Sequence, residues 1–335
     1  MPELSPPLRE VKLLLSQSMH RKLSDSTISL YVHTIKRIAH DFTGREFESI
    51  EFLKDATELV EWLKSRKSSA VLKTALSVCI VLCSPSRPGD VTPSYEHAWQ
   101  VYQGELSTLN KTLASVSIEQ FRSDKQIRNW QSWSDVERVP LYWKKKLEKR
   151  GFDFCNPDIP FDKMYMKTLA DLQKYVVTSI YTMIPPRRLE YRSMKWKDCT
   201  VGDIEYPSKG NWCVMTPVKS FFVFNVYKTA RKFGSQIIEL PRNLYAVLKV
   251  WFAVRKTPWL LFNQHYTPYT GSAFCNYVQR CFSPLGVQNF GATMARSTYL
   301  SYKYKAQKKE RKKDAEMMAH SEATADQHYI KHLNK

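Results

Sequence analysis

Apolar residues recur at helical spacing through the first hundred positions of the chain. Ile28, Tyr31, Ile35 and Ile38 fall on one face of a helix, and either Ser24 or Ser26 can cap it. Residues 69–83 are apolar almost all round, which is typical of a helix at the centre of a bundle. This half of the chain is therefore predicted to form a small helical bundle. Two further helices are predicted over residues 50–64 and 94–114.

The periodicity changes in the second half of the chain. A helix is predicted over residues 167–183, and the pair Pro185-Pro186 ends it. Segments rich in β-branched and aromatic residues follow, separated by turn residues, and they favour a small antiparallel meander. The predicted strands span residues 211–218, 220–227 and 235–240. Further helices are predicted over residues 244–254, 271–281, 292–305 and 313–319.

A polar, basic and tryptophan-rich stretch joins the two halves, and it includes Trp130, Trp133 and Trp143. The predicted fold class is multidomain and mostly α with a small antiparallel β-meander. The predicted domains are a helical domain over residues 1–118, a basic linker with one or two helices over residues 119–160, and a mixed α/β domain over residues 161–335.

The composition narrows the class of partner. The 335 residues carry a formal net charge of +19, and such a field attracts polyanions. Nucleic acid is the commonest partner of such proteins, and an anionic membrane surface is the second. No apolar run reaches the roughly 18 residues of a membrane span, and we see no secretory signal. The seven cysteines include no CxxC pair, so neither a zinc site nor a disulfide framework is predicted. We expect an intracellular, reducing location.

Two clusters of cations are candidates for contacts with DNA phosphates. The alternatives for the second cluster are a solvated helix face and a nuclear-import signal. The first cluster comprises Lys144, Lys145 and Lys146; the second comprises Lys303, Lys305, Lys308, Lys309, Arg311, Lys312 and Lys313.

Five residues of the second half have the chemistry to cleave a phosphodiester without metal. Two arginines, Arg187 and Arg296, can bind the non-bridging oxygens through planar guanidinium forks. Tyr329 can act as the nucleophile and leave a covalent, reversible intermediate. Lys228 can protonate the leaving 5′ oxygen, and His320 can bridge to a phosphate oxygen.

The sequence around these residues resembles the tyrosine recombinases. Residues 182–198 are similar to the first arginine box of that family, with Arg187 at the arginine position and Glu190 at the acidic one. Tyr227-Lys228-Thr229 before a predicted strand looks like the hairpin lysine of the family.

The later boxes follow in the same order. Residues 293–299 are similar to the second box, with Arg296 at the arginine position. Met318-Ala319-His320-Ser321 stands where Leu-Gly-His-Ser is usual, and the nine-residue step from His320 to Tyr329 equals the family spacing. The resemblance covers roughly half of the chain, and the helical N-terminal half also resembles the SAM-like core-binding domain of the family.

The resemblance implies a site-specific recombinase, or integrase, that acts through a 3′-phosphotyrosyl intermediate. Arg187 and Arg296 would bind the scissile phosphate, Lys228 would be the general acid, and Glu190 would orient the site through an arginine salt bridge. The implied partner is double-stranded DNA, bound by a homotetramer on paired sites, with no cofactor and no metal. Integration or excision of a viral or mobile element is the implied role, with the nucleus of a eukaryotic host as the location.

The chain departs from the family pattern at two positions. Pro185-Pro186 replaces a usual glycine, and Thr293 replaces the histidine of the second box. A threonine donates one hydrogen bond to phosphate but exchanges no proton near neutral pH. A catalytically silent DNA-binding relative is therefore one alternative. A type IB topoisomerase is the other, although compact viral topoisomerases begin with a β-rich domain and this chain begins with helices.

Neighbouring residues compete for three of the assigned positions. Arg188 is the rival of Arg187, and the spacing to Glu190 favours Arg187. Lys219 and Lys232 are rivals of Lys228. The rivals of Tyr329 follow Arg296 on a predicted helix and are better explained by packing or DNA contacts; they are Tyr299, Tyr302 and Tyr304.

Overall fold

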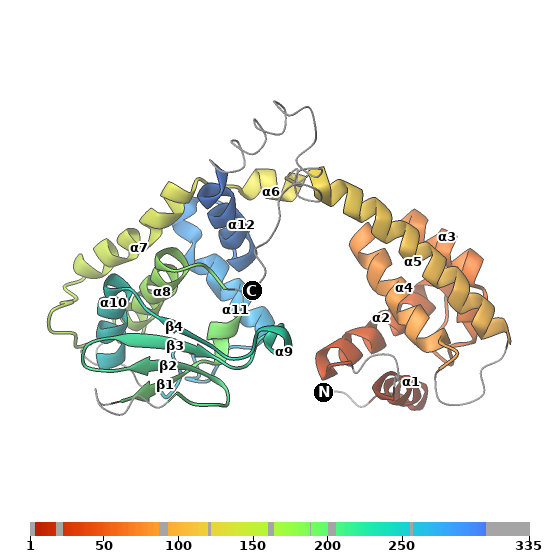
Figure 1. Cartoon of the computed structure of the whole chain (residues 1–335), viewed down its shortest axis with the longest axis horizontal. Coiled ribbons are helices and arrows are strands. Elements are labelled where there is room, and N and C mark those ends of the chain that lie inside the picture. Colours follow the sequence, from red (N-terminus) through yellow and green to blue (C-terminus); the bar gives the residue numbers. More distant parts are fainter. Residues whose placement is uncertain are drawn as a thin grey trace, which may run out of the picture. The chain divides into compact units, whose positions relative to one another are not determined.

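The computed structural model forms two compact units, one ending at Phe121 and the other beginning at Arg122. The first unit is helical throughout its described residues, and the second combines helices with one sheet (Figure 1). The structure describes residues 4–17, 23–86, 93–119, 122–159, 164–187, 189–199, 206–254 and 257–305. Within these ranges, side chains are described for all residues except 115–119.

The first unit is a bundle around the apolar helix α4. Residues such as Leu76, Val78 and Cys79 of this helix are fully buried, which confirms the predicted central core helix. Ser24 caps α2 by accepting a hydrogen bond from the Thr27 N–H, as the sequence predicted. The helices of this unit are α1 (Pro6–Ser16), α2 (Asp25–Thr43), α3 (Ala56–Arg66), α4 (Ser69–Cys83) and α5 (Pro93–Glu119), with a 3-10 turn η1 (Glu51–Lys54).

The single helix predicted over residues 50–64 is wrong, because the chain breaks at Asp55 between η1 and α3. A tertiary contact accounts for the break. The Leu53 carbonyl accepts a hydrogen bond of 2.8 Å from the hydroxyl of the buried Tyr102 on α5. That carbonyl has a partner outside the helix, so the regular helical ladder is not needed to satisfy it.

The sheet of the second unit has the strand order β1-β2-β3-β4. The predicted meander is confirmed, since β2 pairs with β3 and β3 with β4 in antiparallel register. A purely antiparallel sheet is wrong, because the short β1 pairs with β2 in parallel. The sequence of β1 gives no strand signal, since Trp196 is its one apolar residue among Lys195, Lys197 and Asp198. The strands are β1 (Lys195–Asp198), β2 (Asn211–Met215), β3 (Ser220–Phe224) and β4 (Gln236–Glu239).

Helices α8 and α10 cover one face of this sheet (Figure 1), and the core of the unit lies between them. Phe222 and Phe224 of β3 point into that core with Ile180 of α8 and Trp251 of α10. The helices predicted over residues 167–183, 244–254, 271–281 and 292–305 are confirmed within a few residues. The helices of this unit are α6 (Asp124–Asn129), α7 (Trp133–Glu148), α8 (Tyr165–Met183), α9 (Ala230–Phe233), α10 (Arg242–Ala253), α11 (Gly271–Cys281) and α12 (Ala292–Lys303), with the 3-10 turns η2 (Glu190–Ser193) and η3 (Ser283–Leu285).

The stretch predicted as a linker contributes α6 and α7 to the second unit. Trp133 and Trp143 of α7 are 3% exposed and belong to the same core as α8 and the sheet. The Trp143 indole donates a hydrogen bond of 2.8 Å to the Cys281 carbonyl at the end of α11. The tryptophans of this stretch therefore hold α7 against the rest of the unit.

A buried carboxylate joins α7 to α8. Asp171 is 2% exposed and lies 3.2 Å from the Lys146 ammonium, 2.7 Å from the Arg150 guanidinium and 2.9 Å from the Lys174 ammonium. Burial raises the pKa of the Asp171 carboxyl, but the hydrogen bonds and charges of Lys174 and Lys146 outweigh it and hold the pKa below its ordinary value. Lys146 thus shares one buried counter-charge with Arg150 and Lys174.

Replacing Asp171 by asparagine is expected to lower the free energy of unfolding by about 3–5 kcal/mol, because three cations lose their shared counter-charge. A lowered pKa in the folded state stabilises the fold above the unfolded pKa of about 4. The difference between wild type and variant should therefore be complete at pH 7 and shrink as the pH falls below about 4. Urea unfolding at both pH values measures it.

The matched control is Glu148→Gln, which removes the exposed partner of Lys144 at 3.8 Å. That change should cost less than about 1 kcal/mol. Equal stability of wild type and the Asp171 variant at pH 7 would contradict the role assigned to Asp171.

Candidate active site

Arg187 lies between the end of α8 and η2, and it packs against the β3–β4 hairpin. Its guanidinium carbon is 4.0 Å from the centre of the Phe224 ring and 5.0 Å from that of the Tyr227 ring. Its Nη1 donates a hydrogen bond of 2.7 Å to Oε1 of Gln236, the first residue of β4. The two prolines before Arg187 end α8 and leave the arginine at the base of the hairpin.

One donor of the Arg187 guanidinium lacks an acceptor. Its Nε is buried and has no hydrogen-bond partner among the described residues. A buried donor left without an acceptor costs about 1–3 kcal/mol, and an oxygen of a bound anion would remove that cost. Among the described residues, no carboxylate is paired with this guanidinium, so its charge also remains available.

Lys228 lies in the hairpin between β3 and β4, and its side chain is exposed. The loop around it is closed by its own hydrogen bonds. The Tyr227 hydroxyl donates to the Gly234 carbonyl at 2.6 Å, and the Gly234 N–H donates to the Ala230 carbonyl at 2.8 Å. Gly234 has a φ of +66°, a conformation that glycine adopts without strain. The structure therefore brings the loop of Lys228 against Arg187.

Glu190 makes a local contact in the described structure. Its Oε2 accepts a hydrogen bond of 2.9 Å from the Leu189 N–H, and its backbone carbonyl accepts one of 3.1 Å from the side chain of Asn211 on β2. The predicted salt bridge to an arginine is absent for the arginines that the structure describes; Arg188 lies outside them.

Arg296 and Thr293 lie one turn apart on α12, and both are exposed. The opposite side of α12 carries the buried Met294, Ala295 and Thr298 and contacts α7 and α11. Within the described part of the chain, no hydrogen bond or ion pair connects these two residues with Arg187 or Lys228. The two groups occupy different elements of the same unit.

Helix α11 runs between these two groups (Figure 1). A Cβ placed on Gly271, its first residue, would lie 2.8 Å from Nη1 of Arg192 and 4.0 Å from the Leu189 side chain. The start of α11 is therefore next to η2, while its later turns contact α12. The absence of a side chain at Gly271 is what lets Arg192 approach.

The remaining candidates lie outside the described residues. They are His320, Tyr329, Lys308, Lys309, Arg311, Lys312 and Lys313. Their roles stay predictions from the sequence.

The described cations of the two basic clusters have different surroundings. Lys145 and Lys305 are exposed. Lys144 is 3.8 Å from Glu148. Lys303 is exposed on α12, and its hydrogen bond to Tyr299 raises the pKa of the Lys303 ammonium. Lys146 is about as exposed as Lys144, with 36% against 42% of the side chain accessible, and it differs in pairing with a buried carboxylate.

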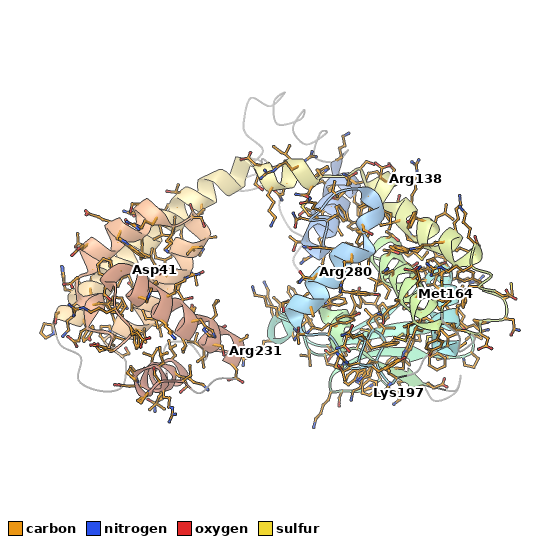
Figure 2. The ribbon with its side chains drawn as sticks, turned by 180° about the vertical axis from the view of Figure 1, so that it is seen from behind. Asp41, Arg138, Met164, Lys197, Arg231 and Arg280 are labelled. Atoms are coloured by element: carbon orange, nitrogen blue, oxygen red, sulfur yellow. The ribbon has the colours of Figure 1, made fainter. Side chains whose placement is uncertain are left out.

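The sequence did not point to a polar hollow of about 680 Å³ beside α11. Asn276, Gln279 and Arg280 line it from the helix, with Ser283 and Gln288 from the following segment. Figure 2 shows Arg280 on this helix. Asparagine, glutamine and arginine side chains pair in bidentate fashion with the edges of adenine and guanine. Gln279 and Arg280 follow Asn276 by three and four residues, which places the three side chains on one side of the helix. This spacing was the signal available in the sequence.

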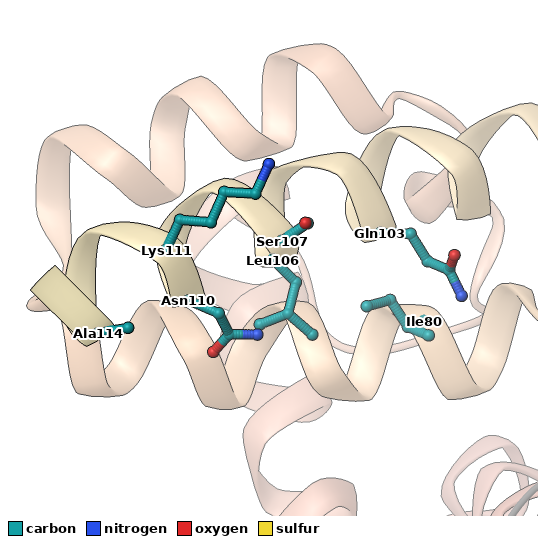
Figure 3. Close-up of a pocket in the computed structure, with 7 residues that line it drawn as sticks. All are labelled: Ile80, Gln103, Leu106, Ser107, Asn110, Lys111 and Ala114. Carbon is teal, nitrogen blue, oxygen red and sulfur yellow. The ribbon is translucent and has the colours of Figure 1, made fainter. Parts of the chain in front are cut away.

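A second hollow, of about 520 Å³, lies on the helical bundle between α4 and α5 (Figure 3). Ile80, Leu106 and Asn110 contribute to it, and Lys111 is its one charged side chain. Its lining, within the described residues, holds no carboxylate, histidine or cysteine.

The described residues contain no group of three or more His, Cys, Asp or Glu side chains suited to hold a metal ion. Of the helices that the structure describes, none combines the length and the hydropathy that a membrane crossing needs.

Comparisons with known proteins give structural neighbours only. No model of a protein family matches the chain, and no curated protein matches it in sequence. The crystal structure of XerA recombinase is 13% identical, with 98% of this chain and 94% of that chain covered, at a TM-score of 0.33. The XerH site-specific recombinase bound to its difH substrate in a pre-cleavage complex is 12% identical, with 91% and 88% covered, at a TM-score of 0.36. At these scores the likeness carries no conclusion about the activity of this chain.

Proposed function

We propose that the protein is a tyrosine site-specific recombinase, a DNA strand transferase. One observation supports this most directly. The Arg187 guanidinium has an unpartnered buried donor and lies at the base of the hairpin that carries Lys228. A cation that recognises an oxyanion and an ammonium that can supply a proton are thus held by one hairpin.

The proposed step is a transesterification at phosphorus. The Tyr329 phenol oxygen bonds to the scissile phosphorus and gives its proton to His320. The bond from phosphorus to the 5′ oxygen breaks, and Lys228 protonates that oxygen. Arg187 and Arg296 neutralise the two non-bridging oxygens of the transition state. The product is a 3′-phosphotyrosyl bond and a free 5′ hydroxyl.

Strand exchange is the reverse of the same step. A 5′ hydroxyl from a partner duplex attacks the phosphorus of the 3′-phosphotyrosyl link and gives its proton to the now neutral Lys228 amine. The leaving Tyr329 oxygen takes its proton back from His320. The free energy of the broken phosphodiester bond is conserved in the covalent link to tyrosine, so neither ATP nor a metal is required. Thr293 contributes one hydrogen bond to phosphate, and Glu190 orders the backbone beside Arg187.

Double-stranded DNA is the proposed partner. The net charge of +19 and the exposed cations Lys145, Lys303 and Lys305 supply attraction to the DNA backbone. The amide and guanidinium groups of α11 have the chemistry to read base edges. The proposed assembly is a homotetramer on paired sites. It would integrate or excise a viral or mobile element, in the nucleus where the host is a eukaryote.

The test is covalent capture from a pool of nicked duplexes with randomised sequence. Cleavage near the nick releases a short fragment and traps the protein on DNA, and sequencing the adducts that survive denaturation identifies the site. We expect wild type to give such adducts. Their complete absence would leave only DNA binding and favour the silent relative.

A type IB topoisomerase would also be trapped, so a second assay separates the two activities. The topoisomerase alternative requires the protein to relax a supercoiled plasmid that lacks any selected site. We expect no such relaxation, and we expect recombination between two selected sites on one plasmid.

A further inference from the structure

Arg187 touches the hairpin of Lys228 on both sides of the lysine. Tyr227 precedes Lys228 directly, and its ring centre is 5.0 Å from the guanidinium carbon. Gln236 follows the loop, and its side-chain oxygen accepts the 2.7 Å hydrogen bond from Nη1. The ring of Phe224, at 4.0 Å, faces the same guanidinium from the end of β3. One arginine thus contacts both ends of one loop.

The choice of Nη1 determines which edge of the guanidinium remains free. Nη1 lies on the Cδ side of the group, so Nε–H and Nη2–H point together toward the other side. That edge is the fork that binds two oxygens of one phosphate. Neither Nε nor Nη2 has a hydrogen-bond partner among the described residues. The Gln236 hydrogen bond therefore orients the guanidinium with its fork free.

The loop between these two contacts is closed by a hydrogen bond of its own. The Tyr227 hydroxyl is bonded to the Gly234 carbonyl at 2.6 Å, and the short helix α9 fills the turn. Within the described residues, the Lys228 side chain makes no hydrogen bond, ion pair or cation–π contact that would fix it by other means. Its position is therefore set by the loop, and the loop is fastened to Arg187 at Tyr227 and Gln236.

We propose that Gln236 is a positioning residue that couples the phosphate-binding Arg187 to the loop of the general acid Lys228. The inference rests on the proposed function. The guanidinium and the ammonium are preassembled as one unit, and loss of the Gln236 side-chain oxygen misplaces both. Gln236→Met tests this, because methionine has a similar length and no comparable acceptor.

Two altered substrates separate the contribution of the Arg187 guanidinium from that of the Lys228 ammonium. A methylphosphonate at the scissile position removes one negative charge, so an arginine is needed less. A bridging 5′-sulfur leaves as a thiolate without protonation, so the general acid is needed less. A variant that is merely unstable would be slowed on both substrates as much as on the natural phosphodiester.

Gln236→Met is expected to slow single-turnover cleavage of the natural site about a hundredfold. On each altered substrate the deficit relative to wild type should shrink to about tenfold, because one of the two misplaced groups is then dispensable. Tyr227→Phe removes only the hydroxyl that closes the loop. Its smaller deficit should disappear on the sulfur substrate and persist on the methylphosphonate.

The matched control is Glu239→Gln on the same strand, which removes a surface ion pair with Lys219 at 3.3 Å. It should cleave all three substrates like wild type. Three results would overturn the inference: wild-type cleavage by Gln236→Met, an equal deficit on all three substrates, or recovery on only one of the two altered substrates. Absence of any wild-type adduct would instead overturn the proposed function.

Discussion

A Tyr329→Phe protein is expected to bind its selected site with wild-type affinity and to form no covalent adduct. Phenylalanine keeps the ring and loses the only atom that can bond to phosphorus, so binding and chemistry should separate completely. Affinity is measured by titration of an unnicked duplex, and chemistry by the fraction of protein trapped on the nicked one.

Tyr302→Phe is the control for this experiment. Tyr302 is an exposed tyrosine on α12, with 61% of its surface accessible, and it lies close to Arg296 in the sequence. That variant should be trapped like wild type. An adduct formed by the Tyr329 variant at the wild-type rate would assign the nucleophile to another residue.

An Arg187→Lys protein is expected to cleave about 10²–10³-fold more slowly than wild type. Lysine keeps the positive charge but has no planar fork, so it cannot hold Gln236 and two phosphate oxygens in one fixed geometry. Its ammonium would also be placed less firmly over the Phe224 ring. Affinity for DNA should change little, because the net charge is preserved. Single-turnover cleavage rates measure the effect.

Arg231→Lys is the matched control for Arg187→Lys. Arg231 lies on α9 in the same hairpin and is exposed (Figure 2). Its replacement should leave the cleavage rate unchanged. A cleavage rate for Arg187→Lys equal to that of the control would remove Arg187 from the chemistry.

Local signals were sufficient where the decisive interactions are local. The helix at residues 69–83 was predicted with its observed bounds, because its apolar character is continuous and a serine, proline and glycine run follows it. Turn residues likewise separated β2, β3 and β4. These elements are specified by composition and spacing within short windows.

Tertiary contacts decided the elements that were missed. The break at Asp55 depends on Tyr102, which is 49 residues from the Leu53 carbonyl that it binds. Strand β1 is held by its parallel pairing with β2 and by the Trp196 N–H, which donates to the Pro258 carbonyl. The four residues of β1 contain no pattern that predicts either of these partners.

The residues of the candidate site show the same difference between local and tertiary signals. Arg187 was assigned from its spacing to Glu190, which is a local pattern. Gln236, its hydrogen-bond partner 49 residues later, has no signature of its own in the sequence. Nothing local reveals that Asp171 lies beside Lys146, and the role of Lys146 as a DNA contact stays a prediction.

Identification of the residue that becomes covalently bonded to DNA is the most direct test of the proposed chemistry. Trypsin cuts after Lys313 and Lys331, so Tyr329 falls in a peptide of residues 314–331 that contains no other tyrosine. We expect mass spectrometry of the trapped, digested adduct to place a 3′-phosphate-linked nucleotide on this peptide. A nucleotide linked through its 5′ phosphate, or attached to any other peptide, would contradict Tyr329 as the nucleophile of a 3′-phosphotyrosyl recombinase.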